Sequence, residues 1–167
     1  GYMDRRVRFL GPSGSLRIGE WKEDGIKFGD DVYQPDSVEI LPPVIPTKIT
    51  CIGLNYEDHA DERDERIPDR PLLFMKGPNC IAGHKETIQL MKEKERIDYE
   101  AELGVVIGQK CKDVTKEEAM EYVMGYTCFN DISNRDDQKI ETNWIRGKAF
   151  DKSAPIGPLI VSPELVP

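Results

Sequence analysis

The stretch from residue 98 to residue 107 carries acidic groups that could do chemistry. Asp98, Glu100 and Glu102 alternate here with apolar side chains. Successive side chains of a strand point to opposite faces, so this stretch predicts one long strand with an acidic face and an apolar face. Neighbouring carboxylates repel one another, and such a row is stable where water solvates it or a cation neutralises it. The pattern leaves both alternatives open: a solvated strand face, or a site for Mg²⁺, Mn²⁺ or Ca²⁺, which prefer carboxylate oxygens.

A further carboxylate, Asp131, follows the apolar segment 126–129, which we predict to be a strand. An aspartate at a strand end is commonly a turn former. If this strand lies beside the acidic one, oxygens from Glu100, Glu102 and Asp131 would fill half of an octahedral metal shell. The remaining positions would then be open to water and a chelating substrate.

One of the two histidines, His59, lies in the charged run 57–66. If this run is helical, Glu62 lies three residues further on and shares its face. A carboxylate beside an imidazole suits a general base that takes a proton from water. The alternative is that the whole run is a solvated charged surface.

The rest of the sequence predicts mostly strands, which would position these groups. We expect strands at 7–10, 16–21, 48–53, 71–76 and 126–130. One helix is predicted over 115–124, because Thr115 and Glu118 form a capping box and Gly125 would end it. The fold class is therefore mainly β (α+β). We expect two domains, a small β domain at 1–45 and a second domain at 46–167, joined at the proline-rich segment 41–46.

Composition narrows the function classes. The 167 residues include 23 Lys and Arg against 31 Asp and Glu, a net charge of −8. This balance argues against nucleic acid, which requires a cationic surface, but not against small anions. No apolar stretch approaches the ~20 residues that cross a bilayer, and the amino terminus lacks the apolar core of a secretory signal. No phosphate-binding glycine loop or serine elbow is present.

The four cysteines, at positions 51, 80, 111 and 128, form no Cys-x-x-Cys pair and lie at no zinc-like spacing from a histidine. They are too few for a disulfide framework. We therefore predict free thiols in a reducing compartment, the cytoplasm. Cys51 and Cys128 fall in apolar runs and are expected to pack as small hydrophobic side chains.

Six short segments follow one another over roughly residues 48–160. They are Ile52–Tyr56 with His59, Pro71–Lys76, Asp98–Gly108, Gly125–Asp131, Asn134–Gln138 and Arg146–Asp151. Their residues, order and spacing together resemble the fumarylacetoacetate hydrolase family, although each segment alone is a weak signal.

The resemblance implies a mixed β-sandwich roll with a divalent cation, usually Mg²⁺, at its open end. It implies metal ligands at Glu100, Glu102 and Asp131. It also implies that His59 and Glu62 activate water and that Lys148 lies close to the metal and the reacting oxygen. Substrate contacts are implied for four further residues: Tyr56, Lys76, Arg135 and Gln138.

Members of that family hydrolyse acylpyruvates, decarboxylate oxaloacetate or isomerise 2-hydroxy-dienoates. The resemblance thus implies a small anionic 2-oxo acid as substrate, with hydrolysis of a carbon–carbon bond as the leading reaction and isomerisation or decarboxylation as the alternative. A homodimer is also expected. The alternative of another class is a non-catalytic β domain used for binding or assembly.

Two features depart from the family pattern. Lys152 stands where the family often has a small hydroxyl residue. The sequence also ends at Pro167, before the second half that family members carry, so we expect an incomplete roll.

Overall fold

The computed structural model describes residues 3–53 and 69–166, and they form a mainly β fold, as the sequence predicts. The strands are β1 Arg5–Leu10, β2 Leu16–Lys22, β3 Gly25–Phe28, β4 Asp31–Tyr33, β5 Glu39–Ile40, β6 Ile49–Gly53, β7 Leu72–Lys76, β8 Ile81–Ala82, β9 Ile97–Asp98, β10 Ala101–Ile107, β11 Val123–Asn130, β12 Ser133–Asn134 and β13 Ala154–Val161. The helices are short: α2 Arg135–Gln138, α3 Ile145–Lys148, and the 3₁₀ turns Pro35–Ser37, Pro78–Cys80, Ala119–Tyr122 and Pro163–Leu165. No helix in these described ranges is long and apolar enough to cross a membrane.

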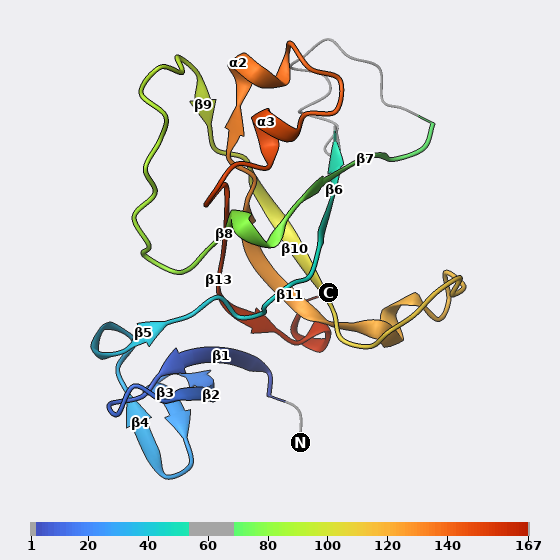
Figure 1. Ribbon diagram of the computed structural model, residues 1–167. Coiled ribbons are helices and arrows are strands. Elements are labelled where there is room, and N and C mark those ends of the chain that lie inside the picture. Colours follow the sequence, from blue (N-terminus) through green and yellow to red (C-terminus); the bar gives the residue numbers. More distant parts are fainter. Residues whose placement is uncertain (1–2, 54–68, 167) are drawn as a thin grey trace.

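Most of the described strands join one sheet. Its order is β10-β11-β13-β1-β2-β3-β4, with β5 beside β1 and β8 beside β13. Two small antiparallel pairs, β6–β7 and β9–β12, stand apart from this sheet. Figure 1 shows β1 to β4 at one end of the molecule, whereas α2 and α3 lie at the other end, beside β9. Strands β10 and β11 run between these ends.

The amino-terminal strands have their own buried core. It consists of Val7, Phe9, Ile26 and Ile40. Strand β1 also continues the large sheet, because Arg5 pairs with Val161 of β13. The domain division at residue 45 stays a prediction.

The long strand predicted from Asp98 to Ile107 is interrupted. Asp98 pairs with Ser133, while β10 begins only at Ala101, which pairs with Asn130 of β11. Between them the Glu100 N–H donates to the Asn130 side-chain oxygen at 3.0 Å. Glu100 therefore leaves the regular alternation because a side chain, and not the backbone of a neighbouring strand, accepts its N–H.

The apolar face of β10 is exposed in the described part of the chain. Leu103, Val105 and Ile107 are each more than half exposed, whereas Val106 on the opposite face is buried. Strand β10 is also an edge of the large sheet. Alternation identifies an apolar face but does not show whether another element in the described chain packs against it.

The predicted helix at 115–124 is also wrong. The Glu118 N–H does donate to the Thr115 hydroxyl oxygen at 3.2 Å, as in a capping box. However, only a 3₁₀ turn follows, because β11 begins at Val123 and pairs with Ile107. Gly125 lies within β11 and ends no helix. Long-range strand pairing overrides the local helical signal here.

Gly125 instead allows β11 and β13 to approach closely. A Cβ at this position would collide with the Val161 carbonyl oxygen and lie 2.6 Å from the Ile160 side chain. We predict that Gly125→Ala lowers the free energy of unfolding by roughly 1–3 kcal/mol, the usual effect of overpacking. Urea denaturation measures this. Cys128→Ala, an exposed change on the same strand, is the control, and equal stability of the two variants would contradict the prediction.

Candidate active site

A buried lysine lies between two of the predicted metal ligands. The Lys148 Nζ is 2.9 Å from Glu100 Oε2 and 2.8 Å from Asp131 Oδ2, and it donates to the Ser133 hydroxyl oxygen at 2.7 Å. The side chains of Lys148 and Asp131 are only 3% and 6% exposed. Two carboxylates from different segments thus converge on one positive charge.

Strand pairing brings these carboxylates together. Glu100 directly precedes β10 and Asp131 directly follows β11, and the pairing of Ala101 with Asn130 sets them at the same end of the two strands. The Asp131 N–H donates to the Glu100 carbonyl oxygen at 2.8 Å. The structure thus meets the condition set by the sequence analysis, that the acidic segment lies beside the strand before Asp131.

Lys148 is carried to this position by the short helix α3. Gly147 packs against α2 so closely that a Cβ would lie 2.8 Å from the Gln138 backbone nitrogen. The Phe74 ring of β7 covers the site from another side, with its centroid 5.0 Å from Lys148 Nζ. A glycine before the lysine is therefore what lets its ammonium reach the carboxylates.

A second buried lysine, Lys76 at the end of β7, contacts the other oxygen of Asp131. Its Nζ lies 2.7 Å from Asp131 Oδ1 and donates to the backbone carbonyl oxygens of Ile132 and Ser153 at 3.1 and 2.7 Å. The side chain is fully buried. Burial lowers the pKa of Lys76, and the charge of Asp131 offsets part of that effect.

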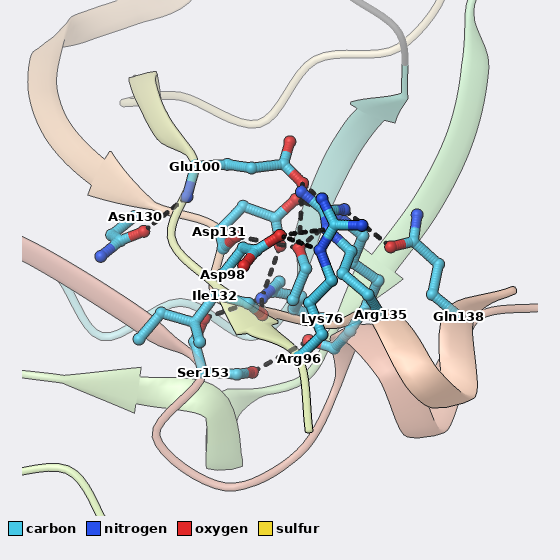
Figure 2. A network of polar contacts seen from close by, with 12 residues as sticks. Lys76, Arg96, Asp98, Glu100, Asn130, Asp131, Ile132, Arg135, Gln138 and Ser153 are labelled. Carbon is cyan, nitrogen blue, oxygen red and sulfur yellow. Dashed lines mark hydrogen bonds and ion pairs between the residues drawn. The ribbon is translucent and has the colours of Figure 1, made fainter. Parts of the chain in front are cut away.

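Arg135 links the acidic groups to α2. Its Nη2 is 2.8 Å from Glu100 Oε2 and its Nε is 3.2 Å from Asp98 Oδ2. Its Nη1 donates to the Gln138 side-chain oxygen at 2.7 Å. Figure 2 shows Asp98, Glu100, Asp131, Lys76 and Arg135 converging. The structure thus brings four residues implied to bind substrate or reacting atoms, namely Lys76, Lys148, Arg135 and Gln138, into one network.

The third predicted ligand, Glu102, lies on β10. It lines a groove of about 630 Å³, together with Asp131, that extends between β6 and β10. Within residues 3–53 and 69–166, however, no three His, Cys, Asp or Glu side chains gather closely enough to hold a metal ion. The structure therefore brings Glu100 and Asp131 together, with Glu102 nearby but outside that pair.

Cys51 of β6 lines the same groove and is half-buried. Burial, together with the charge of Asp131, raises the pKa of its thiol to about 12. A protonated thiol is a poor nucleophile, so Cys51 does not supply one. Cys128 is exposed, contrary to its predicted packing, because it lies on the uncovered face of β11.

Sequence reasoning missed Ser133 as a member of the network and gave Asp98 no role beyond the acidic face. Ser133 donates to Glu100 Oε2 at 2.9 Å and accepts from Lys148, and Asp98 holds Arg135. Ser133 stands two residues after Asp131, a spacing that could have drawn attention to it. Tyr56, His59 and Glu62 lie outside the described residues, so their roles stay predictions.

The comparison with known proteins decides the family. The sequence profile described as the fumarylacetoacetate (FAA) hydrolase C-terminal domain matches residues 48–167. The chain belongs to this family.

Relatives in the fumarylacetoacetate hydrolase family carry enzyme names. The chain is 45% identical over 120 residues to a 2,4-didehydro-3-deoxy-L-rhamnonate hydrolase from Sphingomonas sp., covering 71% of this chain and 42% of that protein. It is 40% identical over 138 residues to the oxaloacetate tautomerase fahd2 of Xenopus laevis, covering 81% and 43%. The chain therefore spans about half the length of these curated relatives.

Solved structures of the same family share the fold. The 5-carboxymethyl-2-hydroxymuconate delta-isomerase of Mycobacterium smegmatis superposes with a TM-score of 0.83 at 34% identity, covering 95% of this chain and 66% of that one. The predicted fold class, a β roll of the fumarylacetoacetate hydrolase type, is confirmed.

The residues present fit the divalent metal that this family implies. Glu100 and Asp131 already direct hard oxygen atoms at a single cation, the Lys148 ammonium. In addition, the buried Asp131 Oδ1 accepts no hydrogen bond within the described chain. It forms an ion pair with Lys76 Nζ. Oxygen donors of this kind suit Mg²⁺, Mn²⁺ or Ca²⁺.

The charge network gives Glu100 a measurable signature. Burial by itself would raise the pKa of Glu100, but Lys148, Arg135 and the Ser133 hydroxyl outweigh it and lower this pKa from 4.5 to about 2. A carboxyl whose pKa is lowered by folding stabilises the fold above its unfolded pKa. That contribution is lost as the pH falls from about 4.5 towards 2.

We predict that Glu100→Gln removes this pH dependence. Between pH 4.5 and 2, the variant should show a smaller slope of unfolding free energy against pH than the wild type. The difference is at most about 1.4 kcal/mol per pH unit, and solvent screening makes it smaller. Urea denaturation at several pH values measures it. Glu117→Gln, which removes an exposed carboxyl, is the matched control, and parallel curves for Glu100→Gln and wild type would contradict the assignment.

Proposed function

We propose that this chain is part of a divalent-metal-dependent enzyme that forms an enolate from a 2-oxo or 2,4-dioxo acid. The observation that carries the proposal is the buried position between Glu100 and Asp131, which already holds a positive charge. The names of the relatives, a hydrolase and a tautomerase, support enzymatic chemistry at this site. Glu102, which lines the adjoining groove, completes the proposed ligand set.

When bound, Mg²⁺ would supply Lewis-acid stabilisation of the negative charge that develops on the substrate oxygen. Residues of the chain would stabilise and bind the rest of the substrate. The Lys148 ammonium, released from its carboxylate partners, would donate a hydrogen bond to that oxygen. Arg135 would bind the substrate carboxylate through its planar guanidinium, which matches a carboxylate bidentately. Gln138 holds the guanidinium in place.

Within this chemistry, hydrolysis of the carbon–carbon bond of an acylpyruvate is the leading proposal. It requires a base that removes a proton from water, and His59 with Glu62 is the predicted pair. The hydroxyl adds to the acyl carbon, the carbon–carbon bond breaks, and the electron pair of that bond forms the enolate of pyruvate. A proton then returns to the carbon.

Tautomerisation or isomerisation is the second candidate, and the oxaloacetate tautomerase among the relatives favours it. Such a reaction needs the same stabilised enolate but no attacking water. Decarboxylation of oxaloacetate would also use that enolate. The small anionic substrate and a homodimeric assembly belong to the same proposal.

Metal binding is the first test. We predict that calorimetric titration with Mg²⁺ gives binding heat for the wild type and little or none for Glu102→Gln or Asp131→Asn, because each variant removes an oxygen anion from the ligand set. Glu117→Gln, an exposed carboxyl, should bind like the wild type. Equal heats for all four proteins would favour the non-catalytic β domain.

His59→Ala separates hydrolysis from tautomerisation. We predict that it lowers kcat for acylpyruvate hydrolysis roughly 100-fold or more, the usual effect of losing a general base, and leaves the enol–keto conversion of oxaloacetate much less affected. Absorbance of the enol form follows both reactions. Unchanged hydrolysis in the variant would remove His59 and Glu62 from the mechanism.

A further inference from the structure

Two lysines flank the same carboxylate, but their other contacts differ. An ammonium group has three hydrogen-bond donors and no acceptor. Two of those of Lys76 are directed at the Ile132 and Ser153 carbonyl oxygens, at 3.1 and 2.7 Å. Its Nζ also forms an ion pair with Asp131 Oδ1 at 2.7 Å. The side chain is fully buried, so its contacts are made within this chain.

The two carbonyl partners give Lys76 a structural link. Ile132 directly follows Asp131, and its backbone N–H donates to the Ser153 carbonyl oxygen at 3.0 Å. Lys76 therefore ties the turn after β11 to the segment that leads into β13. Through this link the position of the Asp131 backbone and of its Oδ1 atom depends on Lys76.

Lys148 makes contacts of another kind. Within the described residues its Nζ has only side-chain oxygens as hydrogen-bond acceptors, those of Glu100, Asp131 and Ser133. It extends from α3, a helix of four residues. Its side chain can thus leave the carboxylates without breaking a contact to the backbone.

We infer that Lys76 is a positioning residue for metal binding, and not a substrate contact. It holds Asp131 by Oδ1, so that Oδ2 and Glu100 stay directed at the position that the Lys148 ammonium now takes and a divalent cation takes over. The inference rests on the proposed function, because it assigns these carboxylates to a metal.

Charge alone predicts the opposite result, which makes the inference testable. Lys76 and Lys148 lie 2.7 and 2.8 Å from the two oxygens of one carboxylate. Removal of either positive charge should strengthen the binding of a cation by simple Coulomb attraction. A positioning role instead predicts that removal of Lys76 weakens cation binding, whereas removal of Lys148 still strengthens it.

The experiment is calorimetric titration of the full chain with Mg²⁺, for wild type, Lys76→Met and Lys148→Met, with thermal melts to verify folding. We expect Lys76→Met to weaken binding by about tenfold or more, as for residues that orient metal ligands, and Lys148→Met to tighten it. Unchanged or tighter binding in Lys76→Met would overturn the inference about Lys76 but not the proposed metal site. No binding heat in the wild type would overturn the proposed metal site as well.

A measurement on the wild type covers the case in which Lys76→Met does not fold. In lysine-labelled protein, the ¹³Cε and ¹⁵Nζ signals of Lys148 should shift on addition of Mg²⁺, whereas a second, buried lysine signal should stay in place. The spectrum of Lys148→Met assigns the first signal. A shift of both signals would show that Lys76 also leaves its partners, and would overturn the inference.

Discussion

The candidate site depends on the burial of the Asp131 carboxylate. An ion removed from water is strongly destabilised unless it is paired and hydrogen-bonded. Here the carboxylate is almost fully buried and each oxygen contacts one ammonium, Lys76 on one side and Lys148 on the other. Neither lysine is close to Asp131 in sequence, so this requirement joins β7, the end of β11 and α3. The described part of the site forms only where these three segments meet.

Part of this arrangement can be predicted from sequence. The apolar run before Asp131 and the acidic run at 98–102 both indicate strands. The sequence leaves their pairing conditional, and the structure shows it, with Ala101 opposite Asn130. What alternation cannot show is that Glu100 lies outside both β9 and β10, because a side-chain oxygen of Asn130 accepts its backbone N–H. A strand pattern assumes that backbone groups pair with backbone groups.

The roles of the lysines could not be predicted from local pattern at all. Lys76 closes an apolar strand and Lys148 follows a glycine, which are ordinary places for a charged residue. Only the fold shows that one nitrogen has two backbone carbonyls as partners and the other has none within the described residues. The helix at 115–124 failed for the same reason, because its last residues form long-range pairs in β11. In each case non-local contacts decide the outcome.

The charges of the site bear on how an acidic chain could bind the anionic substrate proposed for it. The net charge of −8 acts at long range, but physiological salt screens exposed charges beyond about 8 Å. Within the described cluster, four cations face the three carboxylates of Asp98, Glu100 and Asp131; the cations are Lys76, Lys148, Arg135 and Arg96. A divalent cation that takes the place of one ammonium without expelling it from the cluster would leave the site positive. Such a site would bind the proposed carboxylate substrate through local charge, whatever the sign of the surrounding surface.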